Sequence, residues 1–250
     1  MIYFIGAGPG AADLITVRGK ELLEKADLII YAGSLVNPAL LKYAKPECAI
    51  MNSAVMTLEE VIAAMVPAAQ EGKLVIRLHT GDPSVYGAHR EQMDLLKSYN
   101  LDFEIVPGVS SFCAAAASLK AEYTLPGVSQ SVIITRMSGR TSVPEKESIE
   151  RLAAHGCTMV IFLSAGMTAE LSARLTQGGC APETPAAIVY KVTHPGERII
   201  HTTVGGLADA GEKNGIDHTA LVLVGDFLGR EYEFSKLYDA DFETGYRKAR

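Results

Sequence analysis

Short apolar runs alternate with longer amphipathic stretches through the first half of the chain, and this alternation limits the possible folds more than any other feature. The apolar runs occupy residues 2–8, 27–33, 73–82 and 102–108. Stretches with helical spacing of apolar residues occupy 16–26, 37–44, 57–72, 87–99 and 110–119. Nearly continuous Val, Ile and Leu is typical of parallel strands covered on both faces. The pattern therefore predicts an α/β domain with a mostly parallel sheet.

The pattern changes near residue 120. Residues 120–130 have no clear period, and strand-like runs then follow at 131–137, 158–166, 186–193, 197–204 and 219–225. Helical stretches at 146–156, 169–179 and 207–215 separate some of these runs. His194, Pro195 and Gly196 join two of the runs, which predicts a hairpin and hence an antiparallel pair. We therefore expect two α/β domains, 1–119 and 120–250, the second with a mixed sheet.

Composition excludes several classes of protein. The net charge of −6 argues against a general nucleic-acid surface. No apolar run reaches the ~18 residues of a membrane span, and the N-terminus begins directly with a strand-like run, so neither a membrane partner nor secretion is expected. The four cysteines form no C-x-x-C pair, which favours a reducing cytoplasm. The six histidines have no metal-ligand spacing, so no metal site is expected.

The first apolar run ends in a glycine loop with the spacing G-x-G-P-G, at residues 6–10. A dinucleotide fingerprint requires G-x-G-x-x-G and an acidic residue about 20 positions further on. Here Pro9 interrupts the turn, and Ala32, Gly33 and Ser34 occupy the region of the expected acid. The sequence therefore disfavours a dinucleotide-dependent oxidoreductase. A tight turn that needs glycine only for its backbone is the alternative, and this motif alone leaves it open.

Two further strand ends carry similar loops. Gly81, Asp82 and Pro83 follow one run, and the sequence PGVSS at 107–111 follows the next. In open α/β sheets, ligands bind outside the carboxyl ends of the strands, so three such loops predict one ligand cleft. Helix capping by Asp82 and Ser110 is the local alternative.

These loops carry a resemblance to a known family. The segments concerned are GAGPGAADLITVRG, YAGSLVNP, LHTGDPSVYGAHREQ, VPGVSSFCAAAAS, YKVTHPGE and SKLYDADFETGYRKAR. From residue 2 to the C-terminus the chain resembles the tetrapyrrole methyltransferases of cobalamin and porphyrin biosynthesis. Within that family it is most similar to the members that methylate carbon 11 of precorrin-4 or cobalt-precorrin-4.

The resemblance implies an S-adenosylmethionine (SAM)-dependent methyltransferase with S-adenosylhomocysteine as its product. It implies a homodimer whose two α/β domains flank an active-site cleft, with SAM folded between them beside a bowl for the macrocycle. Carried over residue by residue, it implies these cofactor-binding positions: Pro9, Gly81, Asp82, Val85, Ser110, Ser111, Leu163, Tyr190, Val192, Thr219 and Ala220.

No catalytic residue is assigned. The uroporphyrinogen methyltransferases of the same family carry an aspartate, a candidate proton acceptor, in the loop that reads YAGSLVNP here. Methyl transfer from a sulfonium to an electron-rich carbon disperses charge, so an apolar pocket and accurate positioning are expected to carry most of the rate. A strong protein base is helpful rather than obligatory.

The substrate carries acetate and propionate carboxylates, whereas the chain is net negative. Local basic residues are therefore expected to meet them, with these candidates: Arg90, Lys120, Arg136, Arg140 and Lys191.

Four alternatives remain. Methylation at another carbon, of the uroporphyrinogen III or precorrin-3B type, stays open, as does the presence of cobalt in the substrate. A non-catalytic tetrapyrrole-binding module would bind the ring without SAM. An RNA methyltransferase relative is disfavoured by the pI near 5.6 and the absence of tryptophan.

Overall fold

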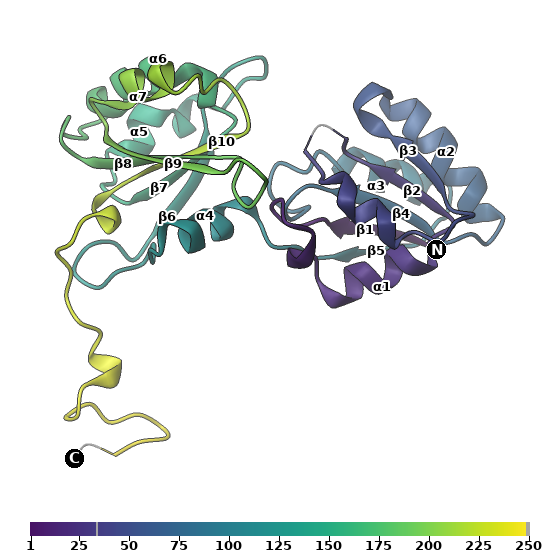
Figure 1. Cartoon of the computed structure of the whole chain (residues 1–250), viewed down its shortest axis with the longest axis horizontal. Coiled ribbons are helices and arrows are strands. Elements are labelled where there is room, and N and C mark those ends of the chain that lie inside the picture. The colour runs from purple at the N-terminus through teal and green to yellow at the C-terminus, as the bar shows by residue number, and fades with distance from the viewer. Residues whose placement is uncertain (34, 249–250) are drawn as a thin grey trace. The chain divides into compact units, whose positions relative to one another are not determined.

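The computed structural model describes residues 1–33 and 35–248. The chain divides into two compact units, each with a five-stranded sheet (Figure 1). The first unit comprises Met1–Ala115 and Lys191–Glu197, and the second comprises Ala116–Tyr190 and Arg198–Arg250. The expected domain boundary after residue 119 coincides with the end of a helix and stays a prediction.

The first unit contains an all-parallel sheet with the strand order β3-β2-β4-β1-β5. Its strands are β1 (Ile2–Gly6), β2 (Leu28–Tyr31), β3 (Ala49–Asn52), β4 (Val75–His79) and β5 (Phe103–Val106). This arrangement confirms the expected parallel sheet. Strand β3 was not among the expected runs. It is an edge strand whose first three residues are exposed, so it lacks the apolar run that marks a buried strand.

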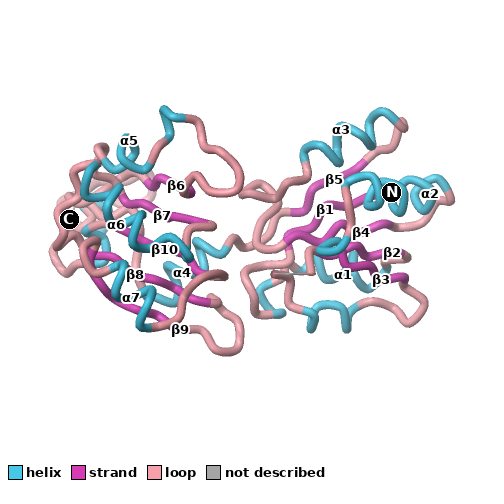
Figure 2. Tube along the Cα trace, turned by 90° about the horizontal axis from the view of Figure 1, so that it is seen from above, coloured by secondary structure: helices cyan, strands magenta, loops and turns pink. Residues whose placement is uncertain are grey.

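Helices cover both faces of this sheet. They are α2 (Leu58–Gln70) and α3 (Arg90–Ser98) on one face, and α1 (Val17–Lys25) and the 3-10 helix η2 (Pro38–Tyr43) on the other. The unit also contains the 3-10 helices η1 (Ala12–Leu14) and η3 (Ser53–Val55), and α4 (Ser111–Leu119) spans the boundary between the two units. Because side chains alternate along a strand, Phe4 packs in the core with α2 and α3, and Ile5 packs in the opposite core with α1 and η2. Helices lie on both sides of the sheet (Figure 2). The resulting burial of both faces explains why the strands read as continuous apolar runs.

The second unit contains a mixed sheet with the order β6-β7-β10-β8-β9. Its strands are β6 (Val132–Arg136), β7 (Thr158–Phe162), β8 (Pro185–Tyr190), β9 (Arg198–Thr203) and β10 (Ala220–Val224). Only β6 and β7 pair in parallel among the described strands of this sheet. Strands β8 and β9 pair antiparallel, which confirms the expected hairpin and the mixed sheet.

One core of the second unit lies between its sheet and three helices, α5 (Ile149–Ala153), α6 (Thr168–Gln177) and α7 (Leu207–Lys213). The unit also has four 3-10 helices, η4 (Glu145–Glu147), η5 (Ala165–Met167), η6 (Asp226–Leu228) and η7 (Lys236–Tyr238). None of the helices that the structure describes is long and apolar enough to span a membrane.

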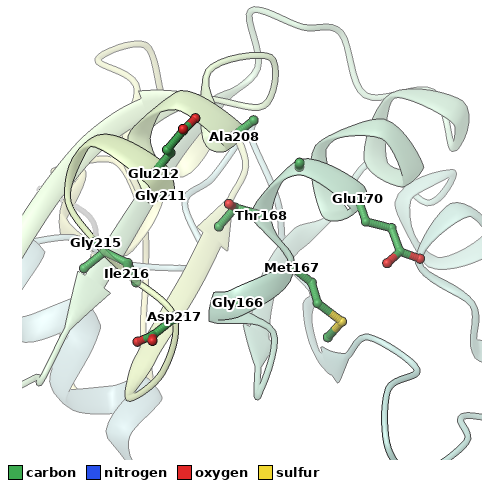
Figure 3. A pocket seen from close by; sticks show the side chains of 11 residues that line it. Gly166, Met167, Thr168, Glu170, Ala208, Gly211, Glu212, Gly215, Ile216 and Asp217 are labelled. Carbon is green, nitrogen blue, oxygen red and sulfur yellow. The ribbon is translucent and has the colours of Figure 1, made fainter.

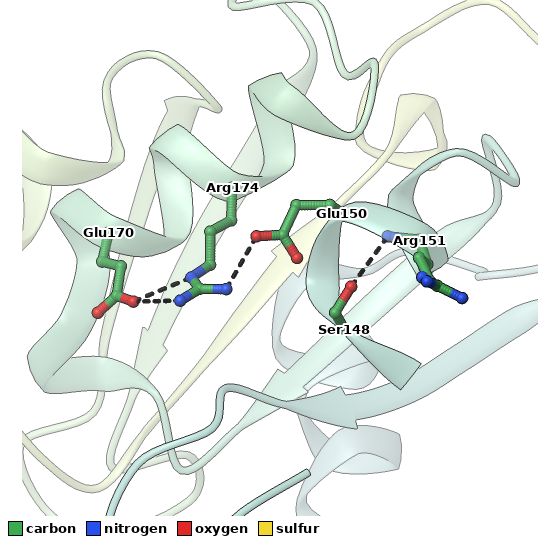
Figure 4. Close-up of polar contacts among 5 residues, drawn as sticks. All are labelled: Ser148, Glu150, Arg151, Glu170 and Arg174. Carbon is green, nitrogen blue, oxygen red and sulfur yellow. Dashed lines mark hydrogen bonds and ion pairs between the residues drawn. The ribbon is translucent and has the colours of Figure 1, made fainter. Parts of the chain in front are cut away.

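An arginine on α6 connects that helix to α5. The Arg174 guanidinium lies 2.8 Å from a carboxylate oxygen of Glu170, one turn earlier, and 2.8 Å from one of Glu150 on α5 (Figure 4). Ser148 caps the start of α5 by accepting from the Arg151 amide. Because these contacts are partly exposed, we expect them to contribute little to stability. Their role is to fix how α6 lies against α5.

Candidate cofactor site

The loops after β1 and β4 meet at the carboxyl edge of the parallel sheet. Gly8 and Gly81 form an isolated antiparallel bridge. The Gly81 amide donates to the Gly8 carbonyl at 2.8 Å, and the Gly8 amide donates to the Gly81 carbonyl at 3.2 Å. The glycine loop and the turn at Gly81, Asp82 and Pro83, called the GDP turn after its sequence, therefore form one backbone surface although Gly8 and Gly81 are 73 positions apart.

Glycines allow the loop after β5 to join this surface. A Cβ atom on Gly6 would lie 2.6 Å from the Gly108 Cα, and one on Gly108 would lie 2.2 Å from the Gly81 carbonyl oxygen. Both distances are too short for any side chain. Gly81 differs, because an added Cβ would approach Ser110 and Ser111 no closer than 3.6 Å, but its φ of +60° is unfavourable for other residues. Close backbone packing thus explains part of the glycine loop.

Asp82 holds the GDP turn to the loop after β5. Its Oδ2 atom accepts from the Gly108 amide at 2.8 Å, and its Oδ1 atom accepts from the Ser84 amide at 2.8 Å and from the Ser84 hydroxyl. Burial opposes ionisation of this carboxyl, but the hydrogen bonds outweigh burial and lower its pKa. Helix α3 does not begin until Arg90, so Asp82 caps a turn and not a helix.

The loop between β8 and β9 packs on the glycine loop and belongs to the first unit. Thr193 Oγ1 accepts from the Ala11 amide at 3.0 Å, and a Cβ atom on Gly10 would lie 2.5 Å from the His194 ring. Asn37 donates to the Gly10 carbonyl at 2.8 Å. The sequence does not predict the contacts of Thr193 and His194, because nothing local relates a hairpin loop to a turn about 180 positions away.

The predicted cofactor residues fall into two groups. The first unit contains Pro9, Gly81, Asp82, Val85, Ser110, Ser111 and Val192, and the second contains Leu163, Tyr190, Thr219 and Ala220. In the second unit, Tyr190 and Ala220 are direct partners on β8 and β10, and the Tyr190 ring meets the His218 ring edge to face. Leu163 directly follows β7, and the residue is 63% exposed.

Backbone strain is concentrated near these residues. Leu163 and Thr219, both predicted site residues, have φ values of +52° and +50°. Four more non-glycine residues with positive φ lie in segments that contain predicted site residues: Tyr86, Ala88, Lys191 and Thr193. Such conformations are unfavourable, above all for β-branched residues, and persist where the surroundings enforce them, often at functional sites.

Arg90 and Arg136, which are among the basic residues considered for the substrate carboxylates, make polar contacts within the protein. Arg90 pairs with Asp94 at 2.9 Å, and Arg136 donates to the carbonyls of Met137, Thr141 and Ser142. Within the described ranges, no group of three or more His, Cys, Asp or Glu side chains is arranged to hold a metal ion.

The loop after β2 corresponds to the loop in which the uroporphyrinogen methyltransferases carry an aspartate. Its two described positions in that region, Ala32 and Gly33, have no carboxylate. Ala32 and Gly33 are half-buried, and the Asn52 side chain fills the space beside Gly33. Ser34 lies outside the described residues.

A separate pocket lies between α6 and α7 (Figure 3). Three acidic residues, Glu170, Glu212 and Asp217, are among those that line it, together with Thr168. Its acidic lining is unsuited to a substrate rich in carboxylates, and none of the predicted cofactor residues belongs to it.

An α/β fold with glycine-backed loops at the carboxyl edge of a parallel sheet is typical of an enzyme that binds a small ligand there. The model of the family described as Tetrapyrrole (Corrin/Porphyrin) Methylases matches residues 1–208. The chain therefore belongs to the tetrapyrrole methylases and is a methyltransferase, which confirms the resemblance seen in the sequence.

Individual relatives share most of the chain. The cobalt-precorrin-4 C(11)-methyltransferase of Methanocaldococcus jannaschii is 53% identical over 99% of this chain and 96% of its own. The enzyme of the same name from Priestia megaterium is 48% identical over 99% of this chain and 97% of its own length. An X-ray structure of a cobalt-precorrin-4 methyltransferase matches with a TM-score of 0.90 and 48% identity over 92% of this chain and 96% of its own.

Proposed function

We propose that this chain transfers a methyl group from SAM to carbon 11 of a corrin precursor at the precorrin-4 level. The observation that carries the proposal is the near full-length identity to relatives of that name. Relatives named for cobalt-precorrin-4 are 48–53% identical, and a Sinorhizobium relative named for precorrin-4 is 42% identical. This difference favours the cobalt-containing substrate.

The loops of the first unit suit SAM as a ligand. SAM carries a ribose diol, an adenine edge, an ammonium and a carboxylate but no phosphate, so backbone groups and a few hydroxyls are enough to bind it. Gly81 presents bare backbone, and Ser110 and Ser111 lie next to it. Asp82 is occupied by three hydrogen bonds, so we assign it the role of shaping the turn.

SAM supplies the methyl group when it is bound. The side chains of Val85 and Leu163 offer apolar surface, which avoids stabilising the starting sulfonium more than the transition state. With no base assigned, we infer that these residues and the loops act by holding the reacting atoms in line at about 3–3.5 Å.

We also propose that the enzyme is a cytoplasmic homodimer, as the family resemblance implies, and light scattering tests the dimer. We propose that the substrate carboxylates are met by basic side chains among these candidates: Arg90, Lys120, Arg136, Arg140 and Lys191. Because such steering is screened by salt, substrate affinity should weaken between low and physiological ionic strength.

Mass spectrometry of the protein incubated with SAM and precorrin-4, with and without cobalt, tests the proposal. We expect one added methyl group, and faster conversion of the cobalt form. Calorimetry separates the alternatives: a dinucleotide oxidoreductase would bind NADP more tightly than SAM, and a tetrapyrrole-binding module would not bind SAM.

A further inference from the structure

Two polar side chains are buried in β4, the central strand of the parallel sheet. Arg77 is 6% exposed and His79 is 4% exposed. Removing such groups from water is unfavourable unless hydrogen bonds compensate for it. Both lie just before the GDP turn, and neither has a part in the function proposed above. Their contacts therefore require an explanation.

Arg77 is connected to the far end of the loop between β4 and α3. Its Nε donates to Gln92 Oε1 at 3.1 Å, and one terminal nitrogen donates to the Ile30 carbonyl at 3.1 Å. The Gln92 side-chain amide then donates to the Ala88 carbonyl at 3.2 Å. Gln92, on the first turn of α3, is itself 5% exposed. A buried chain of hydrogen bonds thus runs from the sheet to the Ala88 backbone.

His79 contacts the neighbouring position of the same loop. Its ring interacts with the Gly87 backbone, which favours the protonated ring, and packs against the rings of Phe4 and His89, with centroid distances of 5.9 Å and 5.3 Å. Its Nε2 atom is buried and finds no hydrogen-bond partner among the described residues. Burial, with the nearby charge of Arg77 and the His89 ring, lowers the pKa of His79 to about 3, so the ring is neutral.

The loop that these side chains hold is strained. Tyr86 and Ala88 have φ values of +53° and +45°, in the region that favours glycine. Gly87 has no room for a side chain, since a Cβ atom would lie 2.1 Å from the Pro83 carbonyl oxygen. The near end of the loop is fixed separately, by Asp82 to Gly108 and by Gly81 to Gly8. The buried network therefore fixes the far end.

We propose that Arg77, His79 and Gln92 are positioning residues for methyl transfer, which hold residues 86–88 in their strained conformation from beneath. This inference rests on the proposed function, because it assumes that the loop after the GDP turn borders the reacting groups. The network fixes the end of the loop remote from Gly81. Its loss should therefore impair turnover of the tetrapyrrole more than SAM binding.

Gln92→Glu separates positioning from stability. The glutamate keeps an acceptor for Arg77, so the buried guanidinium stays paired, but it places a carboxylate oxygen where the amide donated to the Ala88 carbonyl. We expect kcat for the tetrapyrrole to fall at least tenfold, SAM affinity to change less than threefold, and the thermal midpoint to stay within a few degrees. Glu91→Gln, the reverse exchange at the adjacent exposed position, is the matched control.

His79 supplies an independent pair of variants in case Gln92→Glu fails to fold. His79→Asn keeps a hydrogen-bond donor in the region of Gly87 and should retain most of the wild-type kcat. His79→Leu has no such donor, so its kcat should fall at least tenfold. Equal kcat in both variants, or wild-type kcat in Gln92→Glu, would overturn the proposal.

Hydrogen exchange provides a readout that does not depend on the substrate. The amides of residues 86–89 should exchange at least tenfold faster in Gln92→Glu than in wild type or in Glu91→Gln. If the wild type binds SAM but does not methylate precorrin-4, the proposed function fails while this readout still tests the network. Unchanged exchange in an otherwise active enzyme would instead refute the network alone.

Discussion

The Oδ2 atom of Asp82 accepts a hydrogen bond of 2.8 Å from the amide of Gly108, and so joins the turn after β4 to the turn after β5. Together with the bridge between Gly8 and Gly81, this contact unites three loops that are dispersed in the sequence.

Asp82→Asn should weaken SAM binding. The asparagine has a single acceptor oxygen, so either the Gly108 amide or the Ser84 donors lose their partner, a loss of about 1–2 kcal/mol. We expect the apparent SAM constant to rise about tenfold, and at least as much as turnover falls. Ser84→Ala, which removes one donor and leaves the Gly108 contact, is the control. An unchanged SAM constant in Asp82→Asn, measured by calorimetry and steady-state kinetics, would refute this role.

Gly81→Val should abolish SAM binding without unfolding the protein. Valine at φ +60° costs about 1–2 kcal/mol in stability, and its side chain would cover backbone that we propose faces the cofactor. Gly156→Val is a matched control, because Gly156 has φ +63° and no described atom within 4 Å of an added Cβ. Both variants should lose similar thermal stability, and only the first should lose SAM binding. Equal SAM affinity in the two variants would contradict the assignment.

The free energy of unfolding should decrease as the pH is lowered from about 6.5 towards 3, because His79 titrates over this range. The pKa of its ring is about 3 in the folded protein and near 6.5 in an unfolded chain. Between these values the unfolded state binds a proton that the folded state does not, so folding is favoured above about pH 6.5 and loses up to ~1.4 kcal/mol per pH unit below it. Burial lowers the pKa of His89 as well, which adds in the same direction. Urea unfolding between pH 4.5 and 7 measures the slope.

In His79→Asn that slope should be markedly shallower, because the asparagine does not titrate. A slope equal to that of the wild type would show that other groups control acid stability.

No single carboxylate substitution outside Asp82 should lower turnover as much as the loss of a general base would. Loss of a general base typically lowers turnover ~100-fold or more. We expect smaller effects from replacing Glu91, Asp94, Glu122 or Asp226 by the amide, assayed under saturating SAM. A variant that binds both substrates normally and yet is nearly inactive would identify the base and contradict an enzyme that works by positioning.

The sequence predicted the strands that carry the site because they are buried on both faces, which leaves a continuous apolar signal. It did not predict β3, whose exposed edge gives no such signal. The three loops were predicted from glycine and proline at strand ends, but their mutual contacts were not. The interaction of Thr193 and His194 with the glycine loop, and the left-handed backbone of Leu163 and Thr219, depend on tertiary packing that local sequence does not encode.

The position of the transferred methyl group tests the central claim most directly. The protein is incubated with cobalt-precorrin-4 and SAM labelled with ¹³C in the methyl group, and the product is analysed by NMR. We predict a single labelled methyl group bonded to carbon 11. A label on any other carbon would contradict the proposed function, and so would unmethylated cobalt-precorrin-4 when SAM is tightly bound.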